Sequence, residues 1–175
     1  MFNFLIKSLN KCIFVILNNF QMKIYKIHTK QNLPISKDVA WDFLSNPENL
    51  KIITPEYMSF DILSGADRQM FAGQIIEYIV TPIFGIKTKW VTEITHVVQG
   101  NYFVDEQRFG PYALWHHKHF IKEIPGGIEM EDIIHYKLPM GILGQLVHPF
   151  IVKPKLKEIF EYRRKKLIEL FGEIK

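Results

Sequence analysis

Apolar and polar residues alternate with a period of two over most of residues 58–138, and this pattern predicts a run of β-strands. Turn-forming residues such as Gly100-Asn101 and Pro125-Gly126-Gly127 separate the runs. Consecutive strands joined by such short turns pair as antiparallel neighbours, because parallel pairs need long crossovers. The predicted strands are Met58–Leu63, Gln74–Thr81, Ile86–Val97, Tyr102–Gln107, Tyr112–Ile124 and Ile128–Leu138.

Helical spacing flanks this run of strands on both sides. A first strand at Lys23–Leu33 precedes Ser36, which is placed to cap a helix, and two short helices follow at Lys37–Leu44 and Glu48–Ile53. After Pro139, helical periodicity resumes at Gly141–Val147 and Lys155–Phe171, with a break expected at Pro149 and Pro154. The last segment is the only long amphipathic helix to cover the sheet. The predicted class is therefore α+β, with a curved seven-stranded antiparallel sheet around a long C-terminal helix.

The last two predicted strands carry polar residues on an otherwise apolar face. Pairing them outward from Gly126-Gly127 predicts His119 opposite Ile134 and His117 opposite Tyr136. Polar groups buried on such a face need hydrogen-bond partners or a ligand. The residues assigned to this inward face are Trp115, His117, His119, Ile121, Met130, Asp132, Ile134, Tyr136 and Leu138.

Composition limits the remaining choices. The chain has 175 residues, 47% of them hydrophobic, which suits one globular domain, predicted at residues 22–175. Residues 1–21 are predicted to be an extension, either an amphipathic segment or the result of a start assigned too early. The single cysteine, Cys12, excludes an internal disulfide and agrees with a cytoplasmic location. Despite a net charge of +4, no continuous basic stripe predicts nucleic-acid binding.

Several short motifs, in this order of elements, resemble the START-like or SRPBCC superfamily, and in particular its ligand-binding, polyketide cyclase/dehydrase-like members. The motifs are Asn46-Pro47-Glu48-Asn49-Leu50, Thr54-Pro55, Gly110-Pro111-Tyr112 with Trp115-x-His117-x-His119, Met130-x-Asp132-x-Ile134-x-Tyr136, and Phe160-x-Tyr162-Arg163. The resemblance covers most of residues 22–172. It implies a helix-grip fold, in which the sheet wraps around the C-terminal helix and leaves a cavity. The superfamily includes lipid carriers, hormone receptors and aromatase/cyclases, so the fold does not specify the ligand.

The predicted function is binding or carriage of a hydrophobic small molecule of lipid, polyketide or aromatic type in that cavity. Arg163 interrupts the apolar stripe of the last helix, so it needs either an acidic protein partner or a polar group of the ligand. No cofactor and no metal are expected. A transient membrane surface is a further predicted partner, because Lys153, Lys155 and Lys157 lie near the expected cavity mouth. The predicted ligand-binding residues are Trp90, Trp115, His117, His119, Met130, Asp132, Ile134, Tyr136, Phe160 and Arg163.

Two other interpretations of the polar residues remain open. His117 and His119, with Asp132, have the residue types of a zinc or iron site, although two histidines on one strand also occur in purely structural roles. In an enzyme, His119 paired with Asp132 would move protons and Tyr136 would act as an acid, as in a cyclase or dehydratase. No nucleophile motif accompanies them, and the balance favours binding over catalysis.

Overall fold

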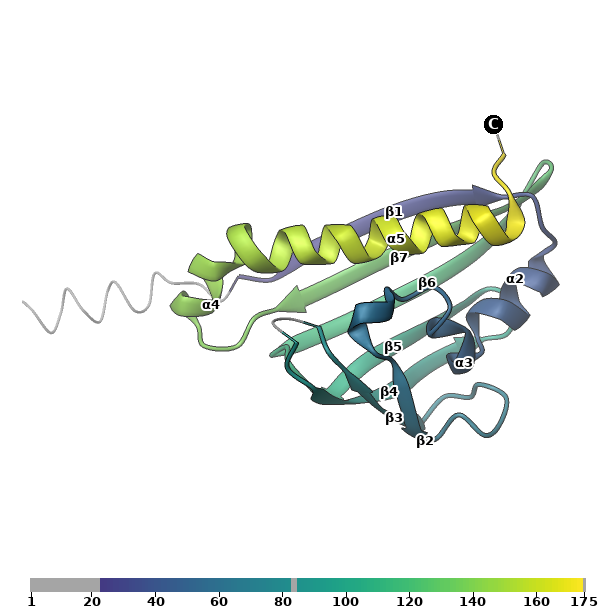
Figure 1. Ribbon diagram of the computed structural model, residues 1–175. Helices are drawn as coiled ribbons and strands as arrows, with labels where there is room; N and C mark the ends of the chain where they lie inside the picture. Colours follow the sequence, from purple (N-terminus) through teal and green to yellow (C-terminus); the bar gives the residue numbers. More distant parts are fainter. Residues whose placement is uncertain (1–22, 83–84, 175) are drawn as a thin grey trace, which may run out of the picture.

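The computed structural model describes residues 23–82 and 85–174, and these form one curved sheet with a long helix along it (Figure 1). The sheet has seven strands in the order β1-β7-β6-β5-β4-β3-β2, and every neighbouring pair is antiparallel. The strands are β1 (Tyr25–Leu33), β2 (Asp61–Ser64), β3 (Gln74–Val80), β4 (Thr88–Val98), β5 (Tyr102–Phe109), β6 (Leu114–Ile124) and β7 (Gly127–Lys137). The predicted seven-stranded helix-grip architecture is confirmed.

Three short helices connect β1 to β2. Ser36 caps α2 (Lys37–Leu44) by accepting a hydrogen bond from the Val39 amide, as predicted. The second predicted helix is shorter than expected, since α3 spans Pro47–Leu50 and a turn follows it. The segment η1 (Glu56–Met58) is a 3₁₀ helix, where a strand was expected to begin.

The C-terminal helix begins after an irregular segment. The helix α4 (Ile142–Val147) leads into η2 (His148–Val152), which has π-helical hydrogen bonding, and then into α5 (Lys153–Phe171). Pro149 and Pro154 each lack an amide hydrogen, so the regular bonding pattern is interrupted where the sequence predicts a break. Within the residues described, no helix is both long and apolar enough to cross a bilayer.

The core divides into two hydrophobic clusters along the sheet. One packs α2 against β6 and β7, and it includes Trp41, which is buried, whereas Val39 is exposed, in contrast to the prediction. The other packs α5 against β4, β6 and β7 through residues such as Trp115, Ile134 and Leu156. The side chains between these clusters shape the site.

The β6–β7 hairpin differs from the prediction in its register. His119 pairs with Asp132 and His117 with Ile134, two residues from the predicted partners. The cause is the turn, because Ile124 pairs with Gly127 and leaves only two residues in the loop. A shift of two residues preserves the side-chain faces, so every residue assigned to the inward face is buried, as predicted.

Two adjacent glycines at this turn allow a matched test of backbone packing. A Cβ added at Gly127 would lie 2.1 Å from the backbone oxygen of Leu33, whereas one at Gly126 would have no neighbour within 4 Å. We expect Gly127→Ala to lower the free energy of unfolding by about 3 kcal/mol. Gly126→Ala, strained only by its φ of +84°, should cost about 1 kcal/mol. Urea denaturation of both variants checks this, and equal losses would contradict it.

Candidate functional site

A cavity of about 170 Å³ lies between the concave face of the sheet and α5. Its wall is mostly apolar and comes from α2, α3, η1, strands β3 to β6 and α5. Aromatic rings form one part of this wall: Trp90 and Trp115 meet edge to face at 5.5 Å, and Tyr112 lies against both. Such a wall suits a flat apolar group.

The structure separates the predicted ligand-binding residues into two groups. Six of them line the cavity, namely Trp90, Trp115, His117, His119, Phe160 and Arg163. The other four, Met130, Asp132, Ile134 and Tyr136, are buried but are absent from the cavity wall. The four support the wall from β7, which lies between β6 and β1.

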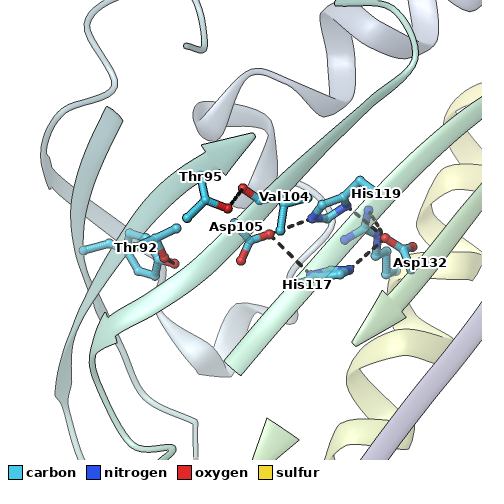
Figure 2. Close-up of polar contacts among 9 residues, drawn as sticks. Thr92, Thr95, Val104, Asp105, His117, His119 and Asp132 are labelled. Carbon is cyan, nitrogen blue, oxygen red and sulfur yellow. Dashed lines mark hydrogen bonds and ion pairs between the residues drawn. The ribbon is translucent and has the colours of Figure 1, made fainter. Parts of the chain in front are cut away.

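Five residues from four elements form what we call the polar cluster: Asp105 of β5, His117 and His119 of β6, Asp132 of β7 and Arg163 of α5. The strand register brings the carboxylates and the histidines together. Asp105 of β5 pairs with His117 of β6, and Asp132 of β7 pairs with His119 of β6. Figure 2 shows the two imidazoles between the two carboxylates. Their rings lie 3.7 Å apart between centroids.

Each imidazole has one nitrogen towards each carboxylate. His119 Nε2 lies 2.7 Å from Asp105 Oδ2, and His117 Nε2 lies 2.9 Å from Asp132 Oδ1, both in hydrogen-bonding geometry. His119 Nδ1 also lies 2.9 Å from Asp132 Oδ1, but outside that geometry. His117 Nδ1 lies 3.5 Å from Asp105 Oδ2. Four imidazole nitrogens therefore face carboxylate oxygens in a nearly closed ring.

Arg163 supplies a positive charge to this buried group. Its terminal nitrogen lies 3.5 Å from Asp132 Oδ1, so the acidic protein partner considered from the sequence is present. The pairing is incomplete, since neither Arg163 Nε nor Asp132 Oδ2 has a hydrogen-bond partner. An arginine that is 8% exposed and also lines the cavity retains a donor for another group.

Burial and neighbouring charge compete in setting the protonation of the polar cluster. Burial alone would raise the pKa of Asp132, but Arg163 and the two histidines hold it well below its usual range. The pKa of Asp105 is lowered too, because the histidines and Arg163 outweigh its burial. Burial and the neighbouring His119 lower the pKa of His117, whereas the two carboxylates overcome burial and raise the pKa of His119.

The polar residues of the cavity wall that sequence reasoning did not assign to it include Tyr78, Thr92 and Asp105. Tyr78 and Thr92 share a hydrogen bond between their hydroxyls. Pairing β5 with β6 through the Gly110-Pro111 turn would have placed Asp105 beside His117, but a register shift by one residue reverses the face of a strand.

Tyr136 is not positioned for the proton-transfer role considered from the sequence. Its hydroxyl forms a hydrogen bond with His148 Nε2 at 2.7 Å. The ring of His148 in turn stacks on that of Tyr25, with 3.5 Å between the ring centroids. Burial raises the pKa of Tyr136 to about 12. The tyrosine hydroxyl is therefore held against η2, at a position that does not line the cavity.

His148 predicts a dependence of stability on pH. Burial, then Lys23 and Lys153, lower its pKa below the value of about 6.5 expected in the unfolded chain. The unfolded state therefore binds more protons at this residue below that pH, so its contribution favours folding above about pH 6.5 and is lost as the pH falls. We expect the free energy of unfolding to decline less steeply between about pH 6.5 and pH 5 in His148→Gln than in the wild type. Parallel urea titrations measure the difference, and identical slopes would contradict it.

Comparisons with known proteins agree on the fold. Neither family models nor the sequences of curated proteins give a match. Solved structures do match: a protein of Thermus thermophilus is 16% identical with a TM-score of 0.62, covering 83% of this chain and 95% of that one. A norcoclaurine synthase from Thalictrum, solved with a transition-state analogue, is 14% identical with a TM-score of 0.59, covering 86% and 98%. The major latex-like protein 151 of Panax ginseng is 11% identical with a TM-score of 0.62, covering 85% and 97%.

The match covers nearly the whole length of each of these proteins. On this chain it includes the sheet and the C-terminal helix. The identities are low, so the likeness shows the fold alone. The chain therefore has the same helix-grip fold as these proteins, which is the fold that the resemblance to the START-like, or SRPBCC, superfamily implied.

Proposed function

We propose that this protein binds and carries a small hydrophobic molecule, with an apolar body against the aromatic wall and a polar group at the polar cluster. The observation that carries the proposal is a largely apolar cavity into which Asp105, His117, His119 and Arg163 converge. Arg163 offers a donor, so a carboxylate, phenol or other oxygen-bearing group is the complementary chemistry.

The volume limits the size of the ligand. An apolar cavity of about 150 Å³ holds a benzene molecule, so about 170 Å³ accommodates one ring and few further atoms. Among the lipid, polyketide and aromatic classes, a single-ring aromatic molecule fits this volume best. A long acyl chain or a fused polyketide would need the walls to move apart.

Tryptophan fluorescence provides a direct test, because Trp90 and Trp115 both line the cavity. A panel of benzoates, phenols and alkylbenzenes would be titrated against the purified protein, with fatty acids for comparison. We expect single-ring compounds with one oxygen-bearing group to bind more tightly than alkylbenzenes, and native mass spectrometry should detect the bound molecule. The absence of saturable binding across the panel would contradict the proposal.

A proton-transfer enzyme is the second candidate, favoured by the hydrogen bond between His119 and Asp105 at the cavity wall. One solved protein of this fold is named a synthase, so the fold is compatible with catalysis. If His119 acts as a base, bound carbon acids in heavy water should incorporate deuterium in the wild type and not in His119→Gln. Equal incorporation in both would contradict this candidate.

We further propose that the protein docks on anionic membranes through an apolar patch on α4 and η2. The patch residues are exposed: Met140 lies just before α4, and Leu143, Leu146, Val147 and Phe150 recur at helical spacing on α4 and η2. Phe150 is 82% exposed. Lys23 and Lys153 lie close enough to lower the pKa of His148, so positive charge gathers beside the patch and complements acidic lipid headgroups.

Vesicle cosedimentation tests the docking proposal. We expect binding to vesicles containing phosphatidylglycerol and little to pure phosphatidylcholine. Phe150→Ser should weaken binding about tenfold or more, since burying a phenylalanine contributes about 1.5–3 kcal/mol. Phe109→Ser is the control, because Phe109 is 72% exposed on β5, outside the patch. A dimer abolished by Phe150→Ser, or binding seen only after removal of residues 1–21, would instead assign the patch to a second copy or to that segment.

A further inference from the structure

We propose that Asp105, His117 and His119 form a binding site for a divalent transition metal, of which Zn²⁺ is the representative, at the wall of the cavity. This departs from the expectation of a metal-free protein drawn from the sequence, and from the ligand set with Asp132 considered there. Two imidazoles and one carboxylate are a ligand set typical of zinc and iron centres that keep open positions. The inference does not depend on which organic molecule the cavity holds.

Distances among the three residues suit a shared ion. Metal ligands about 2.05 Å from an ion lie about 2.9 Å apart in octahedral and about 3.3 Å apart in tetrahedral geometry. Asp105 Oδ2 lies 2.7 Å from His119 Nε2 and 3.5 Å from His117 Nδ1. The three ligand atoms all lie within 4.8 Å of one another. Small side-chain rotations therefore suffice to surround an ion.

The surroundings of the three residues match those of a metal centre. Metal-bound histidines usually direct their second nitrogen to a carboxylate, which fixes the ring orientation. Here the second nitrogens of both His117 and His119 lie 2.9 Å from Asp132 Oδ1. Asp132 is 1% exposed and lies behind the cavity wall, whereas the three proposed ligands line it. Arg163 balances the charge of Asp132 and leaves that of Asp105 for the ion.

Hydrogen counting shows that neutral imidazoles leave a place for a cation, which either a proton or a metal ion can fill. Two neutral imidazoles carry two N–H groups, but four of their nitrogens face carboxylate oxygens. If both N–H groups point to Asp132, two nitrogen lone pairs face the oxygens of Asp105 without a hydrogen between them. A metal ion in that position accepts all of these lone pairs at once. The cavity then provides open coordination positions for an oxygen atom of a bound molecule.

Calorimetric titration with Zn²⁺ and visible spectroscopy with Co²⁺ test the site on the full-length protein. We expect one ion per chain. Zn²⁺ affinity should fall about tenfold or more, relative to the wild type, in Asp105→Asn, His117→Gln and His119→Gln. Asp132→Asn, which touches no ion, should weaken binding by roughly 10–100-fold. His116→Gln is the control, since His116 is adjacent in sequence but bonds to Glu106 on the other face of the sheet. Unchanged affinity in Asp105→Asn, or equal loss in His116→Gln, would overturn the proposal.

X-ray absorption on the zinc-loaded wild type needs no variant and remains informative if the substitutions impair folding. The proposal requires two imidazoles per zinc, and a spectrum with one imidazole or none would overturn it. Ligand binding to the aromatic wall would be measured separately in the presence of a chelator. If the wild type binds the organic ligand but no metal ion, the metal site is rejected and the proposed ligand binding is not.

Discussion

Replacing Asp132 with alanine is expected to lower the free energy of unfolding by about 3–5 kcal/mol, because it leaves Arg163 and two histidines buried without their common partner. A loss of this size is a large part of the total stability of a single domain, which is about 5–15 kcal/mol. Urea denaturation measures it. Glu131→Ala is the matched control: its side chain lies on the opposite face of β7 and pairs with His28 and Lys30 at the surface, so it should cost less than about 1 kcal/mol.

A double-mutant cycle separates the charge pair from packing. Arg163→Met removes the positive charge but keeps an unbranched apolar chain in the same space. In the Arg163→Met background, Asp132→Ala should cost markedly less than in the wild type, because no uncompensated arginine remains. Equal costs in both backgrounds would show that the stability arises from packing and not from the ion pair.

Filling the cavity is expected to abolish ligand binding while preserving the fold. Ile159 lies on α5, lines the cavity and is partly exposed, so a larger side chain there has room to settle into the cavity. Ile159→Trp should weaken binding of a single-ring ligand by about 100-fold, equivalent to about 2.7 kcal/mol. Calorimetry with the tightest compound of the panel measures the change.

Leu170→Trp controls for the effect of an added indole on α5. Leu170 is 42% exposed near the end of the same helix and does not line the cavity, so its replacement should leave ligand affinity unchanged. Thermal unfolding of both variants establishes that the fold is retained. Comparable ligand affinity in Ile159→Trp and Leu170→Trp would contradict the assignment of the cavity as the binding site.

Periodicity sufficed to predict the sheet, the capped helix after Ser36 and the inward face of the hairpin. These features depend on alternation and local turn chemistry, which act over a few residues. The hairpin register was wrong by two residues, since the predicted pairs place Ile124 opposite Glu129 and leave four residues in the loop, whereas the structure leaves two. In the first helix, Val39 was predicted to be buried, but Trp41 is buried instead. A helix of two turns has too few apolar positions to define which side faces the core.

The residues that form the site were harder to predict from the sequence than the fold. His117, His119 and Arg163 were conspicuous because each interrupts an apolar face of its own element. Asp105 lies in a run of mixed polarity, and its position depends on pairing between β5 and β6 and on two register shifts between β4 and β5. Contacts of this kind join residues from separate strands, and single-strand patterns do not specify them. The cavity volume likewise depends on side-chain packing.

The sheet is open, with β1 and β2 as its two edges. Exposed strand edges invite pairing with other chains, which leads to aggregation. The edge strand β2 has only four residues and an irregular register against β3, so it offers a poor template. The nine-residue edge β1 carries the exposed side chains of Lys26, His28 and Lys30. Short length at one edge and positive charge at the other thus oppose edge-to-edge association of this protein, although its apolar patch is exposed.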